Sequence, residues 1–505
     1  MHKSLSWMGT CAFRQKDGIM KKFWGLLLVL CMGITMEMQG QNFEEEFNAF
    51  LKQNEQNFNQ FVDSINRQFA EAMEANMRAF TGEQPKIRDS KPKPVKVPVV
   101  TKDEEPVNLP IPKPEPPTTE PKSTDEPQGP SSEKKPDETT PSNLPSEYTN
   151  ILNFNIFGES IRFATKAFPK ELENISAKAV SQFWIQLSES DYQGMINQCQ
   201  STRKEMAFND WAIYQLVTQM AQETYPRQYD EQVVMTIFLL NQLGMEAKIG
   251  FGNMHLFCLV AVEQQLYGMS FCDIGDHRYY VFELNPRYLN KEASFSFQTY
   301  DNPFPKKTSG IDMNLRHALK SKNVETTIED DSLINISMSM IDLFRTYPQV
   351  DLEVYANACP STEFCQSLDR LMRPYLKDYS QVEAVSLLLY YVQHGFDYAT
   401  DDEQFGYEKP FFCEENFYYP QNDCEDRSVL FSFLVRYLLN MEVVLIDYPG
   451  HVATAVHFPT EVEGESVQYK GKKYIICDPT YIGATIGMEM PEFTPTDRTV
   501  IPLKN

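Results

Sequence analysis

The chain has 505 residues, enough for two or more domains, because a single hydrophobic core rarely extends past about 250 to 300 residues. Its 46 basic and 70 acidic residues give a net charge of -24, which argues against a nucleic-acid partner, since phosphate binding needs positive charge. Ten cysteines are present, and two of them, Cys11 and Cys31, lie near the N-terminus.

Residues 1–40 form the predicted leader. From Met20 the sequence reads "MKKFWGLLLVLCMGITMEMQGQ", with two lysines, an apolar run from Phe23 to Ile34, and small or polar residues near Gly40. This order is typical of a secretory signal peptide, and the run is shorter than the roughly 20 apolar residues that cross a bilayer. We therefore expect an exported protein, periplasmic or secreted, that is soluble after signal cleavage.

Residues 41–83 are predicted to contain one amphipathic helix. Between Phe43 and Phe80 the apolar residues recur at steps that place them on one helical face. A single helix cannot bury this face on itself, so the helix of residues 43–80 needs a partner. Self-association as a coiled coil, or docking on another domain, is favoured over a lipid surface, because the polar face contains few Lys or Arg residues.

Residues 84–147 are rich in proline and charge and almost lack aromatic residues, as in "KPKPVKVPVV". This composition is typical of an extended, disordered linker. Aromatic and aliphatic residues return at Tyr148 and continue in a mixed helix and strand pattern to the end. We therefore expect the N-terminal helix to assemble or dock separately from the rest of the chain.

Cys424 stands in "PQNDCEDRSVLF", at the start of a predicted buried helix. A helix N-terminus favours a thiolate, because free backbone N–H groups and the helix dipole stabilise negative charge. The acidic neighbours act in the opposite direction, so a positively charged partner is expected. His451 in "DYPGHVATAVHF" opens a predicted strand, and Asp478 closes another, "KKYIICDPTYIG", where it is placed to orient the imidazole.

A cysteine at a helix start with an acid two positions on, Gly-His opening a strand, and Asp-Pro-Thr closing the next strand resemble, in this order, the transglutaminase-like superfamily of papain-related enzymes, here of the exported bacterial type. The resemblance covers roughly residues 378–483. It implies that Cys424 is the nucleophile, that His451 is its base and acid, and that Asp478 orients His451. Departures after the histidine and before the cysteine motif remove no triad member.

Each of these residues also fits a structural role. Cys424 alone is compatible with packing or with a disulfide to Cys413 or Cys477. His451 alone fits a structural histidine, and Asp478 alone fits a turn former before proline. The three together favour catalysis. No cofactor is expected, and no metal site, because the cysteines lack C-x-x-C spacing and only one histidine lies nearby.

A shift of 196 positions superposes residues 424–457 on residues 228–261 without a gap. Three aligned pairs carry the interpretation: His451 with His255, Asp426 with Asp230, and Cys424 with Gln228. The segment "VFELNPRY" at 281–288 likewise resembles "YIICDPTY" at 474–481. We infer an internal duplication whose first copy has lost the nucleophile. The alternative is coincidence between two units of similar pattern.

An aromatic insertion, "YATDDEQFGYEKPFFCEENFYYPQND", precedes Cys424 in the second copy. Its rings fit equally the wall of a cleft beside the thiol or the core of a long ordered loop. Tyr419 and the Gln421 amide are candidates to join the Cys424 backbone N–H in stabilising an oxyanion.

The predicted fold is α+β, with a degenerate transglutaminase-like lobe over residues 148–325 and a catalytic lobe over residues 326–505. We expect an exported thiol-dependent hydrolase, a cysteine peptidase or amidase, that cleaves an amide bond of a peptide or protein substrate through an acyl-enzyme. Two alternatives remain: cross-linking by acyl transfer to an amine, and binding of peptide or cell-wall material without catalysis.

Overall fold

The computed structural model describes residues 63–87, 150–165, 167–288, 296–300, 308–320, 334–493 and 497–504, together with Ala49 and Gln53. Helices and strands are mixed along these ranges, as expected for the α+β class. The predicted leader, and the predicted linker beyond residue 87, lie outside the described residues. Within the described ranges, no helix has the length and apolar character needed to cross a membrane.

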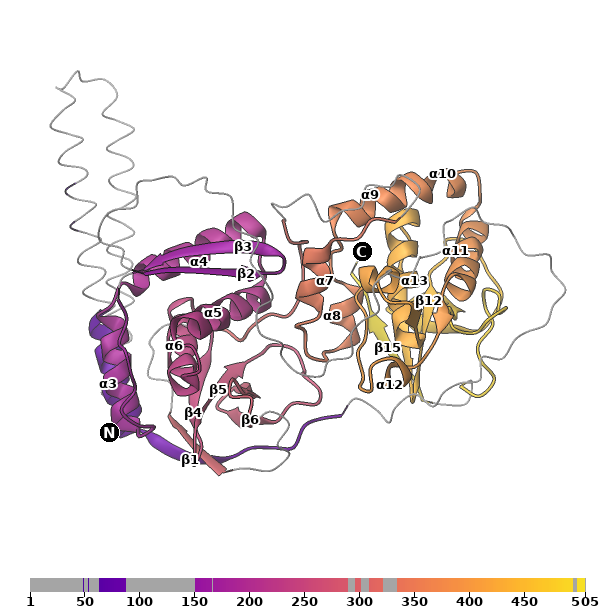
Figure 1. Ribbon diagram of the computed structural model, residues 1–505. Coiled ribbons are helices and arrows are strands. Elements are labelled where there is room, and N and C mark those ends of the chain that lie inside the picture. Colours follow the sequence, from indigo (N-terminus) through magenta and orange to yellow (C-terminus); the bar gives the residue numbers. More distant parts are fainter. Residues whose placement is uncertain are drawn as a thin grey trace, which may run out of the picture.

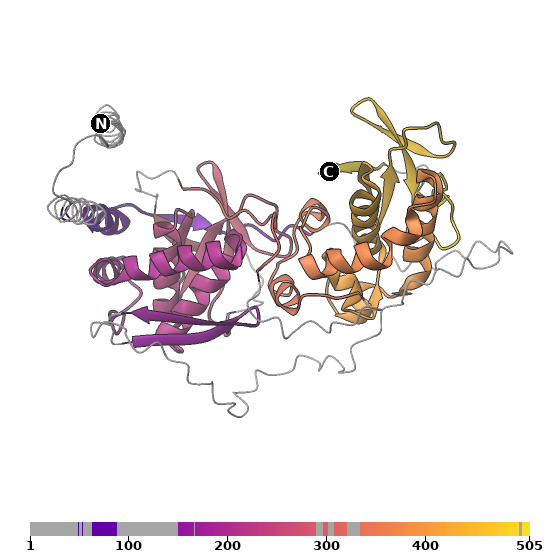
Figure 2. The same ribbon diagram turned by 90° about the horizontal axis from the view of Figure 1, so that it is seen from above.

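Two antiparallel sheets form the centres of two bodies that lie side by side (Figures 1 and 2). The strands of the first sheet are β1 (Met77–Thr81), β4 (Ala247–Phe251), β5 (Leu256–Ala261), β6 (Phe271–Ile274), β7 (His277–Phe282) and β8 (Ser296–Tyr300). Those of the second are β11 (Val443–Tyr448), β12 (His451–Val456), β13 (Ser466–Tyr469), β14 (Lys472–Cys477) and β15 (Thr499–Pro502). We call the residues around the first sheet the first half, and those around the second sheet the second half.

The two sheets share one strand order. The first runs β1-β8-β4-β5-β7-β6, and the second runs β15-β11-β12-β14-β13. Apart from the added β1, each strand of the first sheet has a counterpart in the same place in the second. The predicted correspondence between residues 228–261 and 424–457 is thus matched by the order of the strands.

A buried helix leads into each sheet. In the first half α6 (Tyr229–Gln242) packs on β4 and β5, and in the second α13 (Cys424–Leu439) packs on β11 and β12. Each has an outer partner, α5 (Asp210–Thr224) on α6 and α11 (Gln381–Gly395) on α13. Because α6 and α13 are covered on several sides, most residues of both helices are buried.

Shorter elements complete the two halves. The first half also contains β2 (Asn150–Ile156), β3 (Glu159–Thr165), α3 (Ala177–Ser188) and α4 (Tyr192–Met206). The remaining elements are α7 (Met338–Phe344), α8 (Leu352–Ala356), α9 (Thr362–Leu371), α10 (Arg373–Leu376), β9 (Asp397–Tyr398), α12 (Asp401–Gln404), η3 (Cys413–Phe417) and β10 (Gln421–Asn422). The ladder β2–β3 forms a separate hairpin.

The ladder registers of the two sheets also correspond. The shift of 196 positions makes Cys258 equivalent to Thr454; Cys258 pairs with Phe282, and Thr454 pairs with Cys477. This register places Glu283 where the second half has Asp478. The sequence likeness instead aligns Asn285 with Asp478, and that alignment is wrong by two residues. The shared proline turn guides the sequence alignment, whereas strand pairing decides which residue faces the histidine.

The helix predicted over residues 43–80 is corrected by the structure. Residues 63–75 are helical, but Met77–Thr81 form β1, which pairs antiparallel with β8. Most of residues 43–62 lie outside the described residues. The periodicity extends too far because Phe80, which fits the helical spacing, lies in β1 and stacks on Phe297 of β8, with ring centroids 6.0 Å apart.

Residues 63–83 dock on the first half instead of standing apart from it. Phe69 is buried against Trp184 and Tyr300, with ring centroids 4.5 and 5.4 Å apart. Its neighbours Ala70 and Met73 are buried in the same hydrophobic cluster. The apolar face of this described helix is thus covered by another part of the same chain, and the expectation of a separately docking helix is wrong for this segment.

The segment that carries α7 and α8 joins the two halves, and Figure 1 shows it between them. Trp211 of the first half donates from Nε1 to Thr346 Oγ1 over 2.9 Å. On the other side, Phe344 of α7 stacks on Phe412, with ring centroids 4.2 Å apart. The expected lobe boundary at residues 325 and 326 lies outside the described residues, but the segment after it contacts both halves.

Candidate active site

Cys424 is the first residue of α13 and is 2% exposed. Its thiol donates to Glu425 Oε2 over 3.0 Å. The eight cysteines in the described part of the chain all have free thiols, including Cys413 and Cys477. The structure therefore contains neither of the two disulfides that the sequence left open for Cys424.

Burial raises the pKa of the Cys424 thiol well above its usual value, and the charges of Glu425 and Asp423 raise it further. A hydrogen bond from the Val452 backbone N–H favours the thiolate and acts in the opposite direction. A helix N-terminus contributes only about 0.3 to 2 kcal/mol to a nearby negative charge. The thiol is therefore protonated at neutral pH, and the thiolate expected from its helical position is corrected.

His451 begins β12 directly after a two-residue turn. Tyr448 pairs with His451 across the turn, and Gly450 within it has a φ of 82°, a conformation that glycine adopts without strain. His451 is 2% exposed, and its ring stacks on Phe493 with centroids 4.8 Å apart. A short hairpin with a left-handed glycine thus fixes the imidazole at the start of the strand.

Asp478 follows β14 and faces His451. The His451 Nε2 and Asp478 Oδ2 atoms lie 2.8 Å apart. The other carboxylate oxygen, Oδ1, accepts hydrogen bonds from the backbone N–H groups of Thr480 and Tyr481 over 2.9 and 3.1 Å. The carboxylate is therefore held on both oxygens. His451 Nδ1 is buried and has no hydrogen-bond partner, so this nitrogen is left to act on another group.

The start of α13 and the start of β12 are held together. The backbone N–H of Val452, the residue after His451, hydrogen bonds to the Cys424 sulfur. One turn further along α13, Ser428 Oγ donates to the Val452 carbonyl oxygen over 2.9 Å. The structure thus brings Cys424 to the strand end that carries the His451–Asp478 pair, although the two regions are separate in sequence.

Tyr419 and Gln421, the two oxyanion candidates, belong to the loop before α13. The Tyr419 ring stacks on Phe411 with centroids 4.9 Å apart, and Lys409 Nζ lies 4.9 Å from the Tyr419 ring centroid. The Gln421 carbonyl oxygen accepts a hydrogen bond from Gln404 over 3.3 Å. These contacts place the Tyr419 ring and the Gln421 backbone in loop packing, and a role of either side chain in stabilising an oxyanion stays a prediction.

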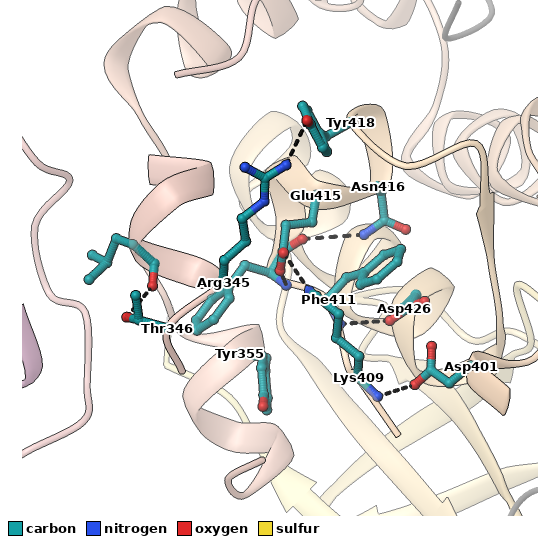
Figure 3. Close-up of polar contacts among 12 residues, drawn as sticks. Arg345, Thr346, Tyr355, Asp401, Lys409, Phe411, Glu415, Asn416, Tyr418 and Asp426 are labelled. Carbon is teal, nitrogen blue, oxygen red and sulfur yellow. Dashed lines mark hydrogen bonds and ion pairs between the residues drawn. The ribbon is translucent and has the colours of Figure 1, made fainter. Parts of the chain in front are cut away.

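Part of the aromatic insertion forms core, which favours the second of the two alternatives left open by its sequence, whereas Tyr407 is exposed. Phe411, Phe412 and Phe417 are each less than 10% exposed. Figure 3 shows how polar contacts fix this loop: the Phe411 N–H donates to Asp426 Oδ1 over 2.7 Å, and Glu415 Oε2 accepts from the Phe412 N–H over 3.0 Å. The insertion is an ordered loop that packs against α13.

The first half retains a matching pair of residues. His255 Nε2 lies 2.7 Å from Glu283 Oε2, and His255 Nδ1 is buried without a partner. Asp230 Oδ1 accepts the backbone N–H of Leu256 over 2.7 Å. Leu256 is the counterpart of Val452, so a carboxylate takes the contact that the thiol makes in the second half. Gln228, at the predicted cysteine position, is the N-cap of α6.

Sequence reasoning missed a cluster of acids around Cys424. Asp401 and Glu408 lie far from the thiol in sequence, but their carboxylate oxygens lie within 4.8 Å of a Glu425 oxygen. Burial, together with neighbouring carboxylates, raises the pKa of Asp401 to about 7. The acidic run "TDDEQF" at 400–405 can be recognised in the sequence. The sequence does not show that the loop returns Asp401 and Glu408 to Glu425.

No protein-family model matches the chain, and no curated protein or solved structure matches it. The resemblance to the transglutaminase-like superfamily therefore stays a prediction from the residues.

The Cys424 thiol should be alkylated slowly by iodoacetamide at pH 7 in the presence of a chelator. Because its pKa is raised, the rate should increase about tenfold for each pH unit up to pH 9, as the thiolate fraction increases. Peptide mapping identifies the modified residue. Cys413 and Cys477 are equally buried controls. Labelling of all three at one rate would mean that unfolding, not the local site, exposes Cys424, and recovery of Cys424 in a disulfide would contradict the prediction.

Proposed function

We propose that the protein is an exported thiol-dependent amide hydrolase with two transglutaminase-like lobes, residues 148–325 and 326–505, of which the second is catalytic. The observation that carries the proposal is the buried His451–Asp478 pair, whose Nδ1 atom has no partner, at the strand end where the N–H of the next residue, Val452, hydrogen bonds to the Cys424 sulfur. An imidazole held on one nitrogen by a carboxylate is oriented to exchange a proton through the other.

In the proposed reaction, His451 Nδ1 accepts the thiol proton while the Cys424 sulfur attacks the carbonyl carbon of the substrate. The carbonyl electron pair moves to oxygen, where the free backbone N–H at the start of α13 stabilises it. The intermediate collapses, the C–N bond breaks, and the amine leaves with the proton from Nδ1. Water then attacks the thioester with His451 again as base, releasing the acid and restoring the thiol.

A protonated resting thiol suits this sequence of steps. Burial and the acids on both sides of Cys424 keep the proton on sulfur, so His451 is required as a base in the attack itself. Asp478 stabilises the imidazolium that forms. Cys424 and His451 are each 2% exposed, so a substrate can reach them only after the side chains that cover them move. Phe493, which stacks on the His451 ring, is one of these side chains.

The correspondence between the halves supports the two-lobe arrangement. Strand order, ladder register and the histidine–acid pair all recur in the first half. The thiol does not recur: in the first half the Asp230 carboxylate accepts the strand N–H of Leu256, the counterpart of the Val452 N–H that hydrogen bonds to the Cys424 sulfur. A carboxylate is a weaker nucleophile toward an amide than a thiolate, so we assign the first lobe to binding or support.

One experiment separates this function from its alternatives. The full chain is incubated with a mixed peptide library and a labelled primary amine, with Cys424→Ala as the control. A hydrolase yields shorter peptides that the Cys424→Ala variant does not produce. Labelled peptides would show that the enzyme transfers the acyl group to an amine and would contradict hydrolysis. Unchanged peptides, with wild type and variant alike, would rule out catalysis on these substrates and favour a binding module.

A further inference from the structure

A group of carboxylates gathers around the start of α13. In the first set, one carboxylate oxygen from each of Asp401, Glu408 and Glu425 lies within 4.8 Å of the other two. In the second set, an Asp423 oxygen, the Cys424 sulfur and a Glu425 oxygen lie equally close together. Two oxygens bound to one calcium ion at 2.3 to 2.6 Å are at most about 5 Å apart. The spacing is therefore that of groups able to share one ion, with Glu425 common to both sets.

The cations of this region make their direct side-chain contacts with other groups. Lys409 Nζ pairs with Glu415 over 2.6 Å. Arg427 donates to Asn422 Oδ1 over 2.9 Å and to the Phe396 carbonyl oxygen over 2.8 Å. They act on the cluster through their charge, Arg427 on Asp423 and Lys409 on Asp401.

Asp423 supplies a second, independent observation. It is fully buried, and neither of its carboxylate oxygens has a hydrogen-bond partner. Buried carboxylates are normally paired, hydrogen bonded or bound to metal. One of these oxygens lies within 4.8 Å of a Glu425 oxygen, and Glu425 also belongs to the carboxylate set. An unpartnered acid therefore lies beside Glu425, the residue that the two sets share.

Both carboxylate oxygens of Asp426 accept backbone N–H groups: Oδ1 accepts the Phe411 N–H, and Oδ2 accepts the Asp423 N–H over 3.2 Å. In Asp401, Oδ2 accepts the Lys409 N–H over 2.5 Å. Figure 3 shows Asp426 directed at the aromatic loop, close to Asp401 and Lys409. Asp426 therefore has a structural role, and it is left out of the ligand set.

We propose that Asp401, Glu408, Asp423 and Glu425 bind one divalent cation through oxygen ligands, and that this cation is calcium. Four carboxylates from two separate segments give the oxygen-rich, irregular coordination that calcium accepts, whereas magnesium requires near-octahedral geometry and keeps several waters. Zinc would instead recruit the Cys424 sulfur. The inference concerns binding and does not depend on catalysis.

The test uses the full chain after treatment with a chelator. Isothermal titration with calcium should show one site that is weakened at least tenfold by Asp423→Asn and by Glu425→Gln. The exposed neighbour Asp402 gives the matched control, because Asp402→Asn removes the same charge outside the cluster. Thermal melts should show a calcium-dependent increase in Tm for wild type and Asp402→Asn only. If Asp423→Asn does not fold, Glu408→Gln replaces it.

Three results would overturn the proposal: no calcium binding by the wild type, equal binding by all variants, or loss of binding in Asp402→Asn alone. Titration of Cys424→Ser with calcium and with zinc separates the two ligand sets. Calcium binding that survives Cys424→Ser supports the oxygen site. Preference for zinc, lost in Cys424→Ser, would make the thiol a ligand and would contradict the calcium assignment.

Discussion

Replacing His451 by alanine should lower kcat/KM for amide hydrolysis by about 10²- to 10⁴-fold, because it removes the general base. Its first-half counterpart His255 has the same pairing with an acid, but there a carboxylate, Asp230, makes the contact with the strand that the Cys424 thiol makes in the second half. His255→Ala should therefore leave the activity within a few-fold. Initial rates with a fluorogenic peptide found in the library experiment provide the measurement.

The control for this pair is His457→Ala, since His457 directly follows β12 and its ring hydrogen bonds to the Lys473 carbonyl oxygen, away from the site. Its activity should equal that of the wild type. Equal losses of activity in His451→Ala and His255→Ala would contradict the proposal that only the second lobe is catalytic. Full activity in His451→Ala would show that His451 is not the general base.

Replacing Phe69 by alanine should lower the free energy of unfolding of the first half by about 3 to 5 kcal/mol, because a large buried ring is lost between Trp184 and Tyr300. This is a large part of the 5 to 15 kcal/mol typical of a folded domain. Urea unfolding followed by tryptophan fluorescence is suited to the measurement, because both tryptophans in the described residues, Trp184 and Trp211, belong to the first half.

Ile87→Ala is the matched control, since Ile87 is 84% exposed and its loss should change stability by less than about 0.5 kcal/mol. Deletion of residues 41–145 should destabilise the first half more than Phe69→Ala does, because it also removes β1 from the edge of the sheet. A deleted chain with an unchanged unfolding transition would restore the picture of a separate N-terminal helix.

The features that the sequence predicts well are those set by short-range patterns. The apolar run after Cys424 predicts α13, and the Pro-Gly turn predicts the position of His451 at the start of β12. The order of acid, histidine and strand ends also predicts the His451–Asp478 pair, which the structure contains at 2.8 Å. These residues lie in elements whose boundaries are marked locally by turns and caps.

The features that it does not predict depend on contacts between distant segments. Phe80 fits helix spacing and strand alternation equally, and only β8 decides between them. Burial sets the charge state of Cys424, and burial is a property of the assembled fold. The approach of Asp401 to Glu425 likewise depends on the path of a long loop, which composition does not encode.

The two sheets protect their corresponding edges in different ways. In the first sheet, the backbone N–H and C=O groups on the outer side of β8 are covered by β1. In the second sheet, β15 occupies the equivalent edge, and among the described residues no strand covers it. That strand is short and ends in Pro502, which has no N–H to offer to an incoming chain. β1 therefore moves the edge of the first sheet from β8 to a strand near the N-terminus, and its loss would expose the N–H and C=O groups of β8 to intermolecular strand pairing.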